Sequence, residues 1–149
     1  MKNYVCKSTL LWVVLTVLSM TKAFSQPVGW TYYTPITITN TGSAISNSPV
    51  KIYVNTAAMI SAGHMQANGS DLRFGSACNG DSSYSFCIDS GINSTHTMMH
   101  VKMNIAAGAT KTVYMFYGNP AASSAIDPTI CIIWRLRFCH AWFYRWFCF

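Results

Sequence analysis

Residues 96–119 read HTMMHVKMNIAAGATKTVYMFYGN, and this stretch decides the fold. Its first ten residues place Met99, Val101 and Met103 on one side of an extended chain and polar residues on the other. Its last ten residues are apolar on both sides until Gly118. Period-two alternation predicts a half-buried strand, and apolar residues on both faces are typical of a strand in the middle of a sheet.

The same alternation recurs upstream in short runs, which read YTPITITN (33–40), PVKIYVN (49–55) and DLRF (71–74). The segments between the runs are rich in Gly, Asn and Ser, which form turns. Only residues 56–66 are suited to a turn or two of helix. We therefore predict one all-β domain over residues 26–128, an antiparallel β-sandwich with a jelly-roll-like arrangement.

The first 25 residues have the three parts of a secretory signal peptide. A basic start precedes an apolar core at 10–20, and a small-residue site ends at Ser25. This core is shorter than the ~20 residues that span a bilayer. We expect cleavage after Ser25, a secreted or cell-surface location, and no transmembrane span in the mature chain.

The formal net charge of +6 comes from the two ends of the chain. The charged residues between positions 26 and 130 balance, and they are Lys51, Arg73, Lys102 and Lys111 against Asp71, Asp81, Asp89 and Asp127. Nucleic-acid binding requires clustered positive charge on the folded domain. We therefore expect no nucleic-acid partner.

Export implies a compartment in which disulfides form. Cys78 and Cys87 flank a turn-forming segment at 79–83. A hairpin there would bring their Cα atoms within the ~4.4–6.8 Å that a disulfide allows. Cys78–Cys87 is the candidate disulfide, and two unpaired cysteines are the alternative.

Four blocks occur in a characteristic order: WTYYTPITITNTG (30–42), ANGSDLRF (67–74), SGINSTHTMMHVKM (90–103) and YMFYGNPAA (114–122). This order resembles the bacterial domain-of-unknown-function family 2341 over almost all of Pro27–Asp127. The resemblance implies an exported or cell-surface module, often within large multidomain proteins, and it carries no established activity. The sequence departs from the family pattern at Cys87, where a large aromatic is usual, and at His100, where Trp is common.

The ionisable residues give no catalytic, cofactor or metal site. His96 and His100 are four residues apart, which is about 13 Å along a strand and too far to share an ion. Asp81 and Asp89 are better explained as turn residues than as the carboxylate pair of a glycosidase. Asn79 to Asp81 lacks the spaced acidic residues of a calcium loop.

The candidate ligand-binding residues are Trp30, Tyr32, Asp71 and Arg73. Asp71 and Arg73 would share a strand face, where a carboxylate and a guanidinium suit contacts to a sugar or peptide. The alternative is a structural role for both. A wider aromatic set would form a sugar-stacking platform or pack within the sheets, and it comprises Trp30, Tyr32, Tyr33, Tyr114, Phe116 and Tyr117.

The function predicted from these features is an exported, non-catalytic module of a larger bacterial surface protein. It would bind a glycan or surface polymer, or serve in adhesion, next to other domains of that protein. A purely structural spacer is the alternative, and a fragment of a polysaccharide-acting enzyme is the weaker one.

The chain ends in CIIWRLRFCHAWFYRWFCF (131–149), which resembles nothing upstream. Three Arg residues spread through it oppose membrane insertion, and they share no narrow helical face. Its Trp, Cys and Arg codons are consistent with a shifted reading frame. We interpret 129–149 as an aberrant tail, produced by a frameshift or truncation near Thr129–Cys131.

Overall fold

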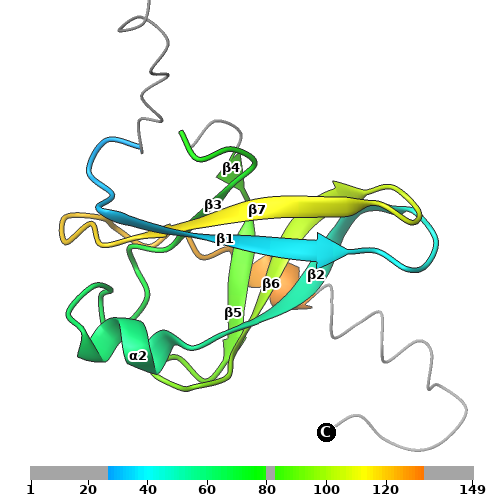
Figure 1. Ribbon diagram of the computed structural model, residues 1–149. Coiled ribbons are helices and arrows are strands. Elements are labelled where there is room, and N and C mark those ends of the chain that lie inside the picture. Colours follow the sequence, from blue (N-terminus) through cyan, green and yellow to red (C-terminus); the bar gives the residue numbers. More distant parts are fainter. Residues whose placement is uncertain (1–26, 80–82, 133–149) are drawn as a thin grey trace, which may run out of the picture.

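The protein forms two antiparallel β-sheets that face each other, as a computed structural model shows (Figure 1). The structure describes residues 27–79 and 83–132, so the predicted signal peptide and residues 133–149 of the tail lie outside it. The elements are β1 (Tyr32–Thr39), β2 (Ile45–Val54), α2 (Thr56–Ser61), β3 (Arg73–Gly75), β4 (Ser83–Tyr84), β5 (Phe86–Ser90), β6 (Thr97–Ile105) and β7 (Thr110–Tyr117). One sheet has the order β1-β7-β3-β4 and the other the order β2-β6-β5. The predicted antiparallel β-sandwich is confirmed.

The two strands of the fold-deciding stretch lie in different sheets. β6 is the middle strand of its sheet, and β7 lies between β1 and β3 in the other. The chain changes sheets through a turn in which Ala109 N donates to Ala106 O, and Gly108 adopts a φ of 66°. This conformation favours glycine because it has no Cβ. The turn therefore supplies each sheet with an interior strand.

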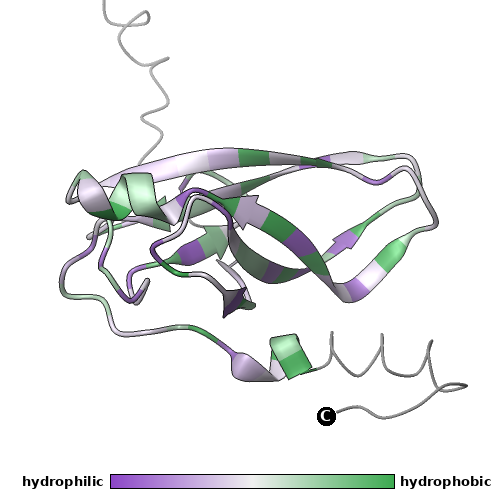
Figure 2. Cartoon of the chain, turned by 90° about the horizontal axis from the view of Figure 1, so that it is seen from below, coloured by the Kyte–Doolittle hydropathy of each residue, from purple (hydrophilic) through white to green (hydrophobic). Residues whose placement is uncertain are grey.

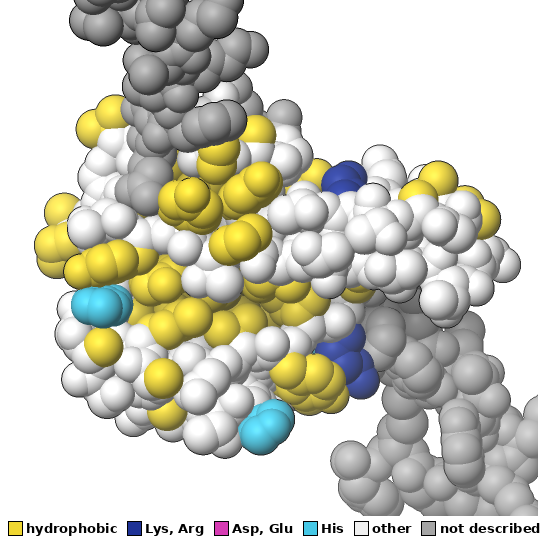
Figure 3. Space-filling view, in the orientation of Figure 1, with side chains coloured by type: hydrophobic (Ala, Val, Ile, Leu, Met, Phe, Trp, Pro, Cys, Tyr) yellow, Lys and Arg dark blue, Asp and Glu magenta, His cyan; other side chains and the backbone are white. Residues whose placement is uncertain are grey.

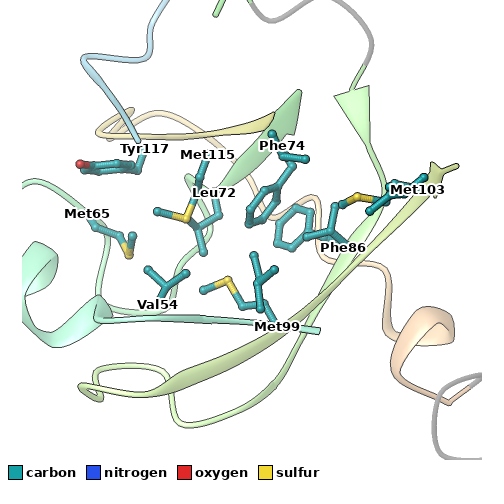
Figure 4. Packing of buried hydrophobic residues seen from close by; sticks show 13 residues of the cluster. Val54, Met65, Leu72, Phe74, Phe86, Met99, Met103, Met115 and Tyr117 are labelled. Carbon is teal, nitrogen blue, oxygen red and sulfur yellow. The ribbon is translucent and has the colours of Figure 1, made fainter. Parts of the chain in front are cut away.

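Strand alternation places the core between the sheets. In β6, the inward side chains of Met99, Val101 and Met103 are almost fully buried, as predicted. In β7, both faces are buried toward its end, which agrees with its predicted place inside a sheet. Figure 4 shows the buried side chains of both sheets pointing toward one another. The ring of Phe74 in β3 meets that of Phe86 in β5 edge to face, with centroids 5.0 Å apart.

His100 lies on the outer side of β6, opposite Met99 and Val101 as the alternation predicts, yet its side chain is fully buried. A segment at 126–132 covers this side of the sheet: Ile126 forms a parallel bridge with Phe86, and Ile130 is buried. Residues 128–132 are helical, and Figure 2 shows this turn beside the strands of the sandwich. The polar face of β6 is therefore covered by later chain.

The helix α2 agrees with the sequence, whereas the helical turn at 128–132 was not predicted. α2 lies within the predicted range 56–66, and the Asn55 side chain caps its start by accepting from Ala58 N. Within the described part of the chain, no helix has both the length and the apolar character needed to cross a bilayer.

Replacing Phe86 with Ala should lower the free energy of unfolding by about 3–5 kcal/mol, because it removes a buried aromatic ring from between the sheets. In a double-mutant cycle, Phe74→Ala and Phe86→Ala should couple by about 0.5–1.5 kcal/mol, since the two rings contact each other. Chemical denaturation measures both quantities.

The matched control is Tyr53→Ala, which removes an aromatic ring that is 60% exposed. This change should alter stability by less than about 0.5 kcal/mol. If Phe86→Ala and Tyr53→Ala cost the same, the core lies elsewhere.

Candidate functional site

An aromatic patch lies on the outer face of the four-stranded sheet. Tyr33 of β1 and Arg73 of β3 both pair with Phe116 of β7, so these three residues form one row across the sheet. The Tyr33 ring centroid lies 6.4 Å from that of Phe116 and 6.0 Å from that of Tyr114. Tyr33 is 42% exposed, whereas Phe116 is buried beneath its neighbours.

Trp30 completes this patch. The Arg73 guanidinium carbon lies 5.2 Å from the Trp30 ring centroid, within the range of a cation–π contact. The indole Nε1 of Trp30 donates to the backbone oxygen of Asp71 at 2.7 Å, which fixes the ring beside β3. We call Trp30, Tyr33, Arg73, Tyr114 and Phe116 the outer aromatic patch. Figure 3 shows hydrophobic side chains gathered above β1, on the side of this sheet.

The Arg73 side chain also holds the chain that follows β7. Its Nη1 donates to the carbonyls of Ser70 and Leu72, and its Nη2 donates to that of Ser123 at 2.7 Å. Burial lowers the pKa of Arg73 below its usual value, and the nearby Asp71 carboxylate partly offsets this effect. Hydrogen bonds from its nitrogen atoms thus hold the guanidinium over the Trp30 ring.

Asp71 has a structural position, in agreement with the alternative named for it. The residue is buried and precedes β3, so it does not share a strand face with Arg73 as predicted. Its Oδ1 accepts from Gln66 N at 3.1 Å, and its Oδ2 accepts from Gly118 N at 2.8 Å. Both carboxylate oxygens therefore join backbone segments, because buried backbone N–H groups need acceptors.

Tyr32 lies on the inner side of β1, away from the outer aromatic patch. Its ring stacks on His64 with centroids 4.1 Å apart, and on Tyr117 at 5.6 Å. A Cβ at Gly118 would lie 2.5 Å from the Tyr32 ring, so the glycine permits this packing. Of the four candidate ligand residues, only Trp30 and Arg73 present side chains to one surface.

The wider aromatic platform divides in the same way. Tyr32 and Tyr117 point inward, whereas Trp30, Tyr33, Tyr114 and Phe116 belong to the outer aromatic patch. Period-two alternation separates Tyr32 from Tyr33 and Phe116 from Tyr117, so the sequence itself contained this division.

The disulfide differs from the candidate pair Cys78–Cys87. Cys87 is bonded to Cys131, with Cα atoms 5.8 Å apart, and Cys78 is a half-buried free thiol. The prediction fails because β4 and β5 belong to different sheets, so the two cysteines do not face each other across a hairpin. Cys87 instead points to the outer side of β5, where the segment 126–132 packs.

Three of the residues considered as metal ligands or catalytic carboxylates lie within the described structure. His96 is exposed and its Nδ1 contacts the Thr95 hydroxyl at 3.0 Å, whereas His100 is buried on the outer side of β6. Asp89 is half-buried in β5. Asp81, and with it the Asn79–Asp81 loop, falls in the gap at 80–82 outside the described residues.

The predicted domain end after residue 128 falls within the helical turn 128–132. Both Ile130 and Cys131 were assigned to the tail. Ile130 is nevertheless buried, and Cys131 forms a disulfide with Cys87 of β5. The frameshift or truncation interpretation stays a prediction.

Residues 68–134 match a family model described as "Domain of unknown function (DUF2341)", which supports a domain of this kind in that part of the chain. The match begins before β3 and runs through β7 and the covering segment. It supports the resemblance for the blocks between positions 68 and 122, and the block at 30–42 lies outside the match. No curated protein and no solved structure matches the chain.

Replacing Asp71 with Asn should lower the free energy of unfolding by about 1–3 kcal/mol, because an amide cannot accept from both Gln66 N and Gly118 N. Asp127→Asn is the matched control, since among the described residues this half-buried carboxylate accepts only from nearby Thr129, within one turn. Thermal denaturation should show a smaller loss for the control. Equal losses would mean that Asp71 does not brace these segments.

Peptide mapping without reduction should yield a fragment that links Cys87 to Cys131, while Cys78 reacts with an alkylating reagent. Cys87→Ser combined with Cys131→Ser should cost about 2–4 kcal/mol, since the bond closes a long loop. Cys78→Ser should leave stability nearly unchanged. A fragment linking Cys78 to Cys87 would contradict the observed pairing.

Proposed function

We propose that this chain, which matches the DUF2341 family model over residues 68–134, is a non-catalytic binding module of an exported surface protein, and that its outer aromatic patch binds a glycan or surface polymer. The observation that carries the proposal is the grouping of three aromatic residues, Trp30, Tyr33 and Tyr114, with Arg73 on the outside of one sheet. An outer face needs no aromatic rings to build the core, so their concentration there calls for another explanation.

The chemistry of the patch suits a carbohydrate. Aromatic rings offer flat apolar surfaces to the C–H faces of sugars, and tyrosine adds a hydroxyl that bonds to sugar hydroxyls. Within the outer aromatic patch, Tyr33 has a largely exposed side chain, so we assign sugar stacking to this residue. The balanced charge of residues 26–130 favours an uncharged polymer over an acidic one.

Two features support an exported location. The first 25 residues have the organisation of a signal peptide, and Cys87–Cys131 is a bond typical of oxidising compartments. The family resemblance adds the expectation of further domains in a larger bacterial protein. We propose that the domain works next to such partners at the cell surface.

A structural spacer is the second candidate, and one observation favours it. The Asp71 carboxylate and the Arg73 guanidinium form hydrogen bonds with backbone groups of this domain. A spacer would use both residues in this way without any ligand. The two candidates differ in whether the face of the patch contacts a polymer.

Affinity electrophoresis separates them. The full chain is run through gels that contain cellulose derivatives, xylan, soluble chitin, starch or pectin, and retardation reports binding. Tyr33→Ala should weaken binding to the retarding polymer by about fivefold or more, because stacking of one ring contributes about 1 kcal/mol.

Tyr53→Ala is the matched control, because it removes an exposed ring from the other sheet. It should leave retardation unchanged. Absence of retardation in every gel, or equal weakening by both variants, would support the spacer instead. Turnover of any of these polymers, lost on Asp89→Asn, would overturn the non-catalytic part of the proposal.

A further inference from the structure

Three potential metal ligands meet on the outer side of the three-stranded sheet. Cys87, His100 and Cys131 each offer one ligand atom, and these atoms all lie within 4.8 Å of one another. The Cys87 sulfur is 4.0 Å from Nδ1 of His100. This group, which we call the Cys-His cluster, has no part in the outer aromatic patch on the other sheet.

The backbone fixes the position of the Cys-His cluster. Cys87 and His100 are directly paired neighbours on β5 and β6, so their side chains leave the sheet on the same side. Cys131 comes from the helical turn 128–132, which is tied to β5 where Asp127 N donates to Phe86 O at 2.8 Å. Cys87 and His100 therefore lie on neighbouring strands, and Cys131 lies on a segment that is hydrogen-bonded to β5.

Burial suits the cluster to a metal. Cys87 and His100 are almost fully buried, and Cys131 is half-buried. Metal ions bind the neutral imidazole of histidine and the thiolate of cysteine. Zn²⁺ with two thiolates and one imidazole carries no net charge, which limits the cost of burial.

We propose that the Cys-His cluster binds Zn²⁺ when the Cys87–Cys131 disulfide is reduced, with both thiolates and His100 as ligands. Zinc takes sulfur at about 2.3 Å and imidazole nitrogen at about 2.0–2.1 Å in a tetrahedral site, so its donor atoms stand roughly 3.5–3.8 Å apart. The distance from the Cys87 sulfur to His100 is already close to this range. The two sulfurs need only separate after their bond opens, and water can occupy the fourth position beside half-buried Cys131.

The two states exclude each other. A phosphine reductant with water opens the S–S bond: phosphorus supplies two electrons and becomes a phosphine oxide, and Cys87 and Cys131 become thiols. Zn²⁺ binding then releases the two thiol protons. In either state the segment 126–131 stays joined to β5, by a covalent bond or through the ion. The chain thus has one cross-link for an oxidising compartment and another for a reducing one.

Cobalt titration tests the proposal. The full chain carries Cys6→Ser, Cys78→Ser, Cys139→Ser and Cys148→Ser, which leaves Cys87 and Cys131 as its only thiols. After reduction with a phosphine, Co²⁺ should bind at one ion per chain and give thiolate-to-metal charge-transfer absorption. Zn²⁺ should displace it, and the oxidised chain should give no such absorption.

His100→Ala should weaken binding to the reduced chain by at least about tenfold, because it removes one of three protein ligands. His96→Ala is the matched control, since this exposed histidine lies outside the cluster. Bound Zn²⁺ should also slow alkylation of both thiols in the chain that keeps His100.

Three results would overturn the proposal. The first is that the reduced chain binds no metal as a folded protein. Either a titration without cobalt absorption or loss of the β-sheet circular dichroism signal in excess Zn²⁺ would show this. The second is equal affinity of His100→Ala and His96→Ala. The third is that the oxidised chain gives the same absorption as the reduced one.

Discussion

The contact between the two sheets is the constraint on which the remaining structure depends. Successive side chains of a strand point to opposite faces, so a residue locked into the core also fixes its neighbours on the outside. Phe74 and Phe86 meet between the sheets, and this contact sends Arg73 and Cys87 outward. Met115 does the same for Phe116. The outer aromatic patch and the Cys-His cluster are both set by the register of the core.

Much of the fold could be predicted because its strands obey a local rule. Three of the alternating runs correspond to β1, β2 and β6, and the run at 71–74 overlaps the start of β3. The apolar character of 110–117 correctly indicated an interior strand, β7. Alternation also separates Tyr32 from Tyr33, although both were grouped by residue type alone. This part of the candidate site was available from the sequence.

What could not be predicted depends on contacts between distant segments. The disulfide required knowing that the chain passes from one sheet to the other between β4 and β5, which no local pattern records. Asp71 looked like a strand residue, but its carboxylate oxygens accept hydrogen bonds from backbone N–H groups five and 47 positions away. His100 looked solvent-facing because the segment that covers it comes from after β7. The composition of each stretch gave no signal of these partners.

The edges of the sheets bear on where a ligand can bind. A bare edge strand invites pairing with another chain, and proteins block this with proline, bulges, short strands or covering segments. Here β1 contains Pro35, and β2 contains Pro49 and an irregularity between Ile45 and Ser48. The described part of β4 has two residues, and β5 is covered at Phe86 by Ile126. These features obstruct the described sheet edges, and the segment 126–132 covers the outer face of the other sheet. The outer face of the β1-β7-β3 sheet is therefore the surface best suited to recognition. This face also carries the aromatic rings.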